Sequence, residues 1–153
     1  MGDKKRNYEF SKFIFRNFPP KKFKSVLVVA DGKGILAKHL AAKYKVRVIE
    51  NRPRQVIKRK RVNYIKGWFT PTTPVQEDFI VGMHPDDATA YIVRNGARCN
   101  KKWAIVPCCL CGPDAANVRG FQKWVDKLTT LDSREVRRGL LPISGKNTVL
   151  WVP

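Results

Sequence analysis

The sequence lacks any apolar run long enough to cross a membrane, and its start lacks the apolar core of a secretory signal. A spanning helix needs about 20 apolar residues, and a signal peptide places an apolar segment behind a basic start, whereas this chain begins MGDKKRNYEF. We therefore expect an intracellular protein, cytoplasmic or nuclear, with no membrane partner. A mitochondrial location stays open because residues 1–24 are basic, although Asp3 and Glu9 are unusual in a transit peptide.

Cysteine is also scarce, and its placement is unlike that of a secreted disulfide framework. Three of the four cysteines are crowded together as Cys108, Cys109 and Cys111. A structural zinc site takes four ligands, and beside the C-x-x-C pair of Cys108 and Cys111 only Cys99 and His84 are conceivable, at irregular spacing. The sequence therefore predicts no metal site, and small thiols at the packed end of a buried strand.

Acidic residues are few, and the excess of positive charge is the strongest compositional feature. The chain has 31 Lys and Arg against 12 Asp and Glu, a formal net charge of +19 over 153 residues. A domain of this size tolerates such self-repulsion when a polyanion is near, so we expect a nucleic-acid partner, RNA or a ribonucleoprotein before DNA. The alternative is that the charges only solvate a surface. The candidate phosphate-binding side chains are Arg52, Arg54, Lys58, Arg59, Lys60 and Arg61, together with Lys21 and Lys22.

Short apolar runs alternate with helical patterns along the chain. Residues 26–30 are apolar and rich in β-branched side chains, as in a strand buried on both faces of a parallel sheet. Further strands are expected at 45–50, 62–69, 78–83, 103–106 and 148–152, and helices at 9–18, 35–44, 53–61, 88–98 and 117–131.

This alternation predicts an α/β fold, with a single Rossmann-like, doubly wound, mostly parallel sheet of about six strands. The predicted domain covers residues 25–153 and is abbreviated at its C-terminal end, with too little chain for a full antiparallel hairpin. Residues 1–24 form a basic, aromatic arm, whose helix could pack on the sheet or lie along a nucleic acid. Asp86 or Asp87 can cap the helix at 88–98.

The turn after the first strand has the composition of a ligand-binding turn. Asp31-Gly32-Lys33-Gly34 opens into a helix, and the next strand ends in Glu50. Glycines let the backbone approach a ligand, and an acid at this position can accept ribose hydroxyls. Right-handed crossovers should bring these residues to the same edge as the turns at 84–87 and 108–112. The alternative is a tight strand-to-helix turn with no ligand.

Over roughly residues 25–131 the chain resembles class I S-adenosylmethionine-dependent methyltransferases. VLVVADGKGIL stands where that family has its glycine-rich first motif, VIEN where it has the ribose-binding acid, and IVGMHPDDAT where its fourth strand meets the substrate pocket. HPDDAT followed by AIVPCC resembles a subgroup with a His-Pro turn after strand 4 and Pro-Cys-Cys after strand 5. The resemblance implies S-adenosylmethionine as the cofactor. The residues that it implies for cofactor binding are Ala30, Asp31, Gly32 and Gly34 at the methionine part, Glu50 at the ribose, and Asn51 and Phe69 near the adenine.

Three side chains of the later turns are candidates for catalysis. His84 could orient a substrate amine or act as a base, because its unperturbed pKa lies near neutrality, or it could be an ordinary turn residue. Asp86 is a weaker candidate. Cys108 could attack a pyrimidine ring, as the Pro-Cys of cytosine-C5 RNA methyltransferases does, or it could be an inert thiol.

Two functions follow from these patterns. The first is an S-adenosylmethionine-dependent methyltransferase acting on RNA, and the second is a catalytically inactive relative that binds RNA or associates with ribosomes. A dinucleotide-dependent oxidoreductase is disfavoured because Ala37 occupies the third glycine position of G-x-G-x-x-G.

Overall fold

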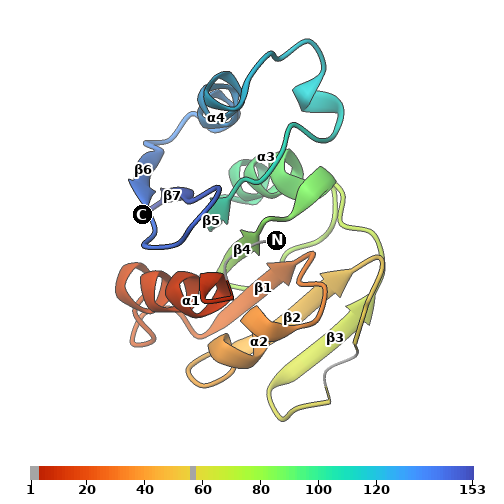
Figure 1. Cartoon of the computed structure of the whole chain (residues 1–153). Helices are drawn as coiled ribbons and strands as arrows, with labels where there is room; N and C mark the ends of the chain where they lie inside the picture. Colours follow the sequence, from red (N-terminus) through yellow and green to blue (C-terminus); the bar gives the residue numbers. More distant parts are fainter. Residues whose placement is uncertain (1–3, 56–57) are drawn as a thin grey trace.

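The computed structural model describes residues 4–55 and 58–153, which form one seven-stranded sheet flanked by helices on both faces (Figure 1). The first half contains α1 (Arg6–Asn17), β1 (Ser25–Val29), α2 (Ile35–Leu40), β2 (Lys45–Glu50), β3 (Val62–Lys66) and β4 (Phe79–Met83). The second half contains η1 (Asp86–Ala88), α3 (Thr89–Cys99), β5 (Lys102–Val106), η2 (Pro113–Ala115), α4 (Phe121–Thr130), β6 (Arg137–Leu140) and β7 (Thr148–Val152). Within the described residues, no helix is both long and apolar enough to cross a bilayer.

The strand order β3-β2-β1-β4-β5-β7-β6 confirms the predicted α/β fold. Strands β1 to β5 run parallel to one another, with Val28 of β1 opposite both Val48 of β2 and Val81 of β4. Strands β1, β4 and β5 are buried on both faces and therefore read as continuous apolar runs, whereas no residue of the edge strand β3 is buried. The order reverses between β1 and β4, which places the ligand-binding crevice of this architecture at their carboxyl ends.

The C-terminal end of the sheet is more complete than the sequence predicted. Strand β7 is antiparallel to both β5 and β6 and lies between them, so that β6 and β7 form the hairpin that the chain seemed too short to hold. The expectation of an abbreviated end was therefore wrong. The strand β6 was missed because its sequence, Arg137-Arg138-Gly139-Leu140, has no apolar pattern that marks a strand, and none of its residues is buried.

Two apolar cores lie on opposite faces of the sheet. On one face, Phe10 and Ile14 of α1 pack with Leu36 and Leu40 of α2. On the other face, the core contains Ile92 and Val93 of α3 and Trp124, Val125 and Leu128 of α4. Burial of each such side chain stabilises the fold by about 1.5–3 kcal/mol. Of the two placements considered for the N-terminal helix, the structure has it packed on the sheet.

The helix expected at 53–61 is not found over residues 53–55 and 58–61. The rest of that prediction, residues 56–57, lies outside the described residues. Four consecutive positive charges at 58–61 oppose a helix, and so short a helix is marginal in water in any case. The segment instead closes on β3 by a β-bridge between Arg59 and Val62.

The caps predicted for α3 are also absent. Asp86 and Asp87 form the 3₁₀ turn η1, and Ala88 stands at the N-cap of α3 with no side-chain hydrogen bond to the helix. Asp86 contributes through its backbone, because its carbonyl accepts a hydrogen bond from Oγ1 of Thr89 at 2.7 Å. This frees the Asp86 carboxylate for another partner.

Candidate functional site

A cleft of about 1020 Å³ lies at the carboxyl edge of the parallel strands. It is lined by the turns that follow β1 to β5 and by residues near the start of α1. The sequence-predicted residues that line it are Ala30, Asp31, Gly32, Glu50, Asn51, Arg52, Arg54, Phe69, His84 and Asp86. Gly34 and Cys108 do not line it, although both lie in turns that do.

The glycine turn has a left-handed backbone at three positions. The φ angles are 59° at Ala30, 57° at Gly32 and 74° at Gly34. Ala30 stands where a glycine would adopt this conformation without strain, and such strain concentrates at functional sites. A Cβ at Gly32 would meet no atom within 4 Å, so the backbone is open to an approaching ligand at this residue.

Asp31 holds the turn against α2. Its carboxylate accepts hydrogen bonds from the backbone N–H of Leu36 at 3.2 Å and of Ala37 at 2.8 Å, two donors in the first turn of the helix. Burial raises the pKa of Asp31 to about 7, the nearby charge of Glu50 adds to the rise, and the two hydrogen bonds oppose it. The side chain of Asp31 therefore has a structural task at the edge of the cleft.

Glu50 closes the turn from the neighbouring strand. The side chain is buried, its Oε2 accepts a hydrogen bond from the N–H of Gly32 at 2.8 Å, and its Oε1 accepts one from the N–H of Arg52 at 2.8 Å. The hydroxyl of Tyr64 donates to the carbonyl of Gly32 at 3.1 Å. A carboxylate has about four lone-pair sites, so Glu50 retains acceptor capacity for ligand hydroxyls.

His84 joins three segments of the chain. A carbonyl oxygen can only accept a hydrogen bond, so Nε2 of His84 donates to the carbonyl of Lys146 at 3.0 Å. In the neutral ring the other nitrogen, Nδ1, then accepts a hydrogen bond from the guanidinium of Arg6 at 3.4 Å. Burial lowers the pKa of His84, and the charge of Arg6 lowers it further. In this arrangement the ring is neutral, and both of its nitrogens are engaged within the protein.

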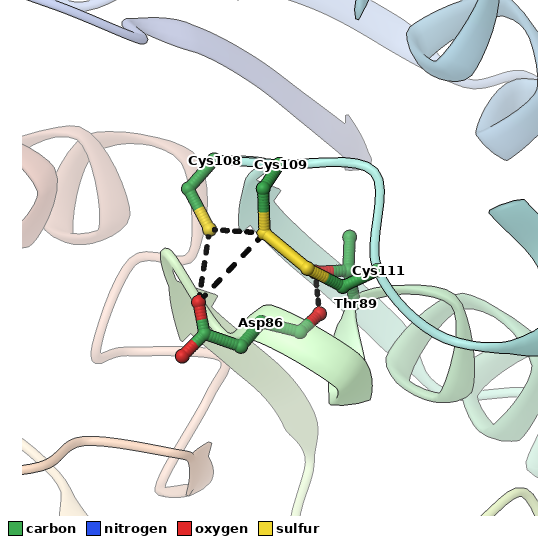
Figure 2. The surroundings of a disulfide bond; sticks show 5 residues. All are labelled: Asp86, Thr89, Cys108, Cys109 and Cys111. Atoms are coloured by element: carbon green, nitrogen blue, oxygen red, sulfur yellow. Dashed lines mark hydrogen bonds between the residues drawn. A yellow bond between two sulfur atoms is a disulfide. The ribbon is translucent and has the colours of Figure 1, made fainter. Parts of the chain in front are cut away.

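The cysteines after β5 lie beside the turn after β4, as Figure 2 shows. Cys109 and Cys111 form a disulfide, and the Cys108 thiol donates to Oδ1 of Asp86 at 3.2 Å. Burial raises the pKa of Cys108 to about 11, and the hydrogen bond to Asp86 adds to the rise. Cys108 is therefore a protonated thiol near neutral pH, which is a poor nucleophile.

The sequence-based prediction for these cysteines was wrong about where they lie. Cys109 and Cys111 are bonded to each other, a pairing that the sequence did not predict. All three residues are half-buried in the loop beyond the strand rather than packed at its buried end. No sequence signal relates Asp86 to the cysteines, because only the pairing of β4 with β5 brings them together.

The predicted phosphate-binding residues divide into two groups. Arg52 and Arg54 follow β2 and line the cleft. Residues 58–61 precede β3, and residues 21–22 precede β1, so both segments lie toward the opposite edge of the parallel sheet. Backbone hydrogen bonds of 2.8 Å from Val46 to Arg61 and of 2.9 Å from Lys45 to Lys24 join the start of β2 to the end of residues 58–61 and to the residue that precedes β1.

Three further residues of the cleft were not among the candidate site residues. Lys4 and Arg6 line it from the start of α1, and Trp68 lines it with 74% of its side chain exposed. Trp68 was assigned to a strand at 62–69, but β3 ends at Lys66, so the indole stands in a loop. The available sequence signal for Trp68 was its place as an aromatic residue in a basic segment, residues 51–76, that contains no acid.

Comparison with known proteins gives no match to a family model and none to a curated protein sequence. Solved structures do match. An S-adenosylmethionine-dependent methyltransferase from Aquifex aeolicus superposes with a TM-score of 0.65 at 18% identity, over 97% of this chain and 92% of the other. The fold is that of S-adenosylmethionine-dependent methyltransferases.

Two structures solved with ligands show the same fold. PigF with SAH has a TM-score of 0.59 and a sequence identity of 14% over 94% of this chain. A variant of MtNAS in complex with S-adenosylmethionine has a TM-score of 0.59 and a sequence identity of 19% over 95% of this chain. The chain spans 54% of the length of PigF and 60% of that of MtNAS. One fold hosts many functions, so function has to be argued from the cleft.

Proposed function

We propose that the chain is an S-adenosylmethionine-dependent methyltransferase that acts on RNA. The observation that carries this proposal is the pairing of Glu50 with Gly32, which fixes an open glycine turn at the mouth of a cleft in a methyltransferase fold. The same arrangement puts a backbone surface and a carboxylate side by side, as the recognition of a nucleoside requires.

The cleft fits the proposed cofactor. Its volume is at the upper end of the roughly 300–1,000 Å³ of small-molecule sites, which leaves room for part of a substrate. We assign the methionine part to the turn at Ala30 and Gly32, the ribose to Glu50, and the adenine to the region of Asn51 and Phe69. When bound, the cofactor supplies a methyl group already activated on a sulfonium, so the protein has mainly to align the acceptor and exclude water.

The lining of the cleft supports a polyanionic substrate. Its basic side chains are Lys4, Arg6, Lys33, Arg52 and Arg54. None of these five forms an ion pair with an acid among residues 4–55 and 58–153. The exposed indole of Trp68 adds a face on which a base can stack, which is typical of proteins that bind single-stranded RNA.

Calorimetric titration of S-adenosylmethionine, and of its demethylated product, into the purified chain tests the cofactor site. We expect micromolar binding that Glu50→Gln weakens by at least about tenfold, because the amide replaces a charged acceptor. Glu77→Gln is the matched control, since Glu77 is also a buried acid but pairs with Arg47 away from the cleft.

Absence of binding up to millimolar concentration by a folded chain that still binds RNA would overturn the methyltransferase proposal. The inactive RNA-binding relative would then account for the fold and the charge. Cofactor binding without any affinity for RNA would overturn the substrate assignment alone.

A further inference from the structure

Three metal-binding side chains, those of Asp86, Cys108 and Cys109, meet where the turn after β4 touches the loop after β5 (Figure 2). The Sγ of Cys108 lies 3.2 Å from Oδ1 of Asp86 and 3.5 Å from the Sγ of Cys109. The Sγ of Cys109 lies 3.9 Å from the same Oδ1. Cys111 adjoins this group through its disulfide to Cys109.

These separations match a tetrahedral metal centre. With Zn–S bonds of about 2.3 Å and Zn–O bonds of about 2.0–2.2 Å, ligand atoms at tetrahedral angles lie roughly 3.5–3.8 Å apart. The three measured distances bracket that range. Among the described residues, Asp86, Cys108 and Cys109 form a group of donor atoms compact enough for one ion.

The two segments are held together independently of the cysteines. The N–H of His84 donates to the carbonyl of Val106 at 3.0 Å, which joins the ends of β4 and β5. A Cβ added at Gly112 would lie only 3.0 Å from the carbonyl oxygen of Asp87, so the loop approaches the turn too closely here to leave room for a larger side chain. The donor atoms of Asp86, Cys108 and Cys109 are therefore brought together by the fold before any ion binds.

We propose that the chain with its Cys109–Cys111 disulfide reduced binds one zinc ion through the thiolates of Cys108, Cys109 and Cys111 and through Oδ1 of Asp86. A dithiol reductant supplies two electrons and two protons to the disulfide and becomes a disulfide itself. Zinc binding then releases one proton from each of the three thiols. Three thiolates and one carboxylate suit Zn²⁺ better than Mg²⁺ or Ca²⁺, which prefer oxygen ligands.

The proposed site is coupled to the cleft by position. Asp86, Asp87, Gly112 and Pro113 line the cleft, and Asp86 is a proposed ligand. Zinc would cross-link the two segments that form this wall, whereas the disulfide joins residues of one segment only. Oxidation would then replace the zinc cross-link between the turn after β4 and the loop after β5 by a disulfide within that loop.

The test uses the whole chain, purified either in the presence of a dithiol or after mild oxidation. We expect the reduced chain to retain one zinc ion per chain by elemental analysis after dialysis, and the oxidised chain to retain none. Cobalt in place of zinc should give the sulfur-to-cobalt charge-transfer absorption of a thiolate site, which Cys108→Ala reduces. Cys99→Ala is the matched control, because Cys99 is a half-buried free cysteine outside the proposed site, where its thiol donates a hydrogen bond to Asn95.

Alkylation of the cysteines is a second measurement, and it tests zinc binding in the wild-type chain even if a variant folds poorly. In the reduced wild type, zinc should protect Cys108, Cys109 and Cys111 from alkylation but leave Cys99 reactive, and Asp86→Asn should weaken this protection. A reduced, folded chain that takes up no zinc at micromolar concentration would overturn the proposal. So would cobalt absorption that Cys99→Ala reduces as much as Cys108→Ala does.

Discussion

His84 donates from Nε2 to the carbonyl of Lys146 at 3.0 Å, although the two residues lie 62 positions apart in the sequence. Lys146 belongs to the loop between β6 and β7, and His84 follows β4, so the bond ties the C-terminal hairpin to the edge that carries the cleft. The guanidinium of Arg6 contacts the other ring nitrogen and brings the start of α1 to the same point.

Replacing His84 with alanine should loosen the hairpin loop. We expect faster amide hydrogen exchange at residues 145–147 and a loss of about 1 kcal/mol in the free energy of unfolding, because the hydrogen bond to the carbonyl of Lys146 is removed. Exchange followed by mass spectrometry measures the first effect and urea unfolding the second. Loss of methyl transfer with unchanged exchange would instead make the ring a catalytic group.

Asp31 should make the protein less stable as the pH rises. Its pKa is about 7 in the fold and near 4 in the unfolded chain, so the folded state binds more protons between these values and stability falls with increasing pH. Between pH 5 and pH 8 we expect a loss on the order of 2–3 kcal/mol that is absent in Asp31→Asn. Urea unfolding of both proteins at the two pH values measures the difference. An equal slope in the two proteins would show that Asp31 ionises normally.

Asp132 has the opposite dependence. Burial opposes its ionisation, but hydrogen bonds from Arg134 and from Nε1 of Trp103 outweigh burial and lower the pKa to about 2. Its contribution is therefore complete above pH 4 and is lost as the pH falls toward 2. Asp132→Asn should cost about 1.5–3 kcal/mol at pH 7 and less at pH 3, by chemical unfolding. Asp126→Asn, at an exposed aspartate paired with Arg138, should cost much less.

Trp68 should contribute to RNA affinity through stacking. We expect Trp68→Ala to weaken binding of a single-stranded oligonucleotide by about 1–3 kcal/mol, as measured by fluorescence anisotropy. Leu140→Ala provides the control, since both side chains are 74% exposed but Leu140 does not line the cleft. Equal effects of the two changes would argue against a stacking site.

The two groups of basic residues should differ in what they affect. Exchanging Arg59 and Lys60 for Glu should weaken RNA binding and reduce its salt dependence, because fewer phosphates are neutralised, while cofactor affinity stays unchanged. Exchanging Arg52 and Arg54 for Glu should impair both, because these residues line the cleft. Titrations of RNA at several salt concentrations and of the cofactor separate the cases. Unaltered RNA binding after the first exchange would exclude the edge near residues 58–61 from the interface.

The strands that carry the core were predictable because burial on both faces leaves a continuous apolar run. Strands at 45–50 and 148–152 have the predicted bounds, and β1 and β4 each differ by a residue. The strand at 137–140 was not predictable, because an exposed edge strand needs no apolar residues and its pairing is supplied by β7.

The candidate site was predictable where it depends on adjacent strands. Gly32 follows β1 and Glu50 ends β2, and the methyltransferase motif that the sequence resembles relates them directly. The contacts of Asp86 with Cys108 and of His84 with Lys146 depend on the order β4-β5-β7, which the local sequence does not encode. The left-handed backbone at Ala30 was hidden for a different reason, since alanine is not a residue that marks such a conformation.

Strand β7 lies between β5 and β6 although it follows both of them in the chain. A ribosome therefore releases residues 137–140 before the strand with which they pair exists, and the edge of β5 is open until residues 148–152 emerge. Open strand edges pair readily with other chains. Strand β7 is thus the element that covers the edge of β5, and its loss would leave that edge open to other chains.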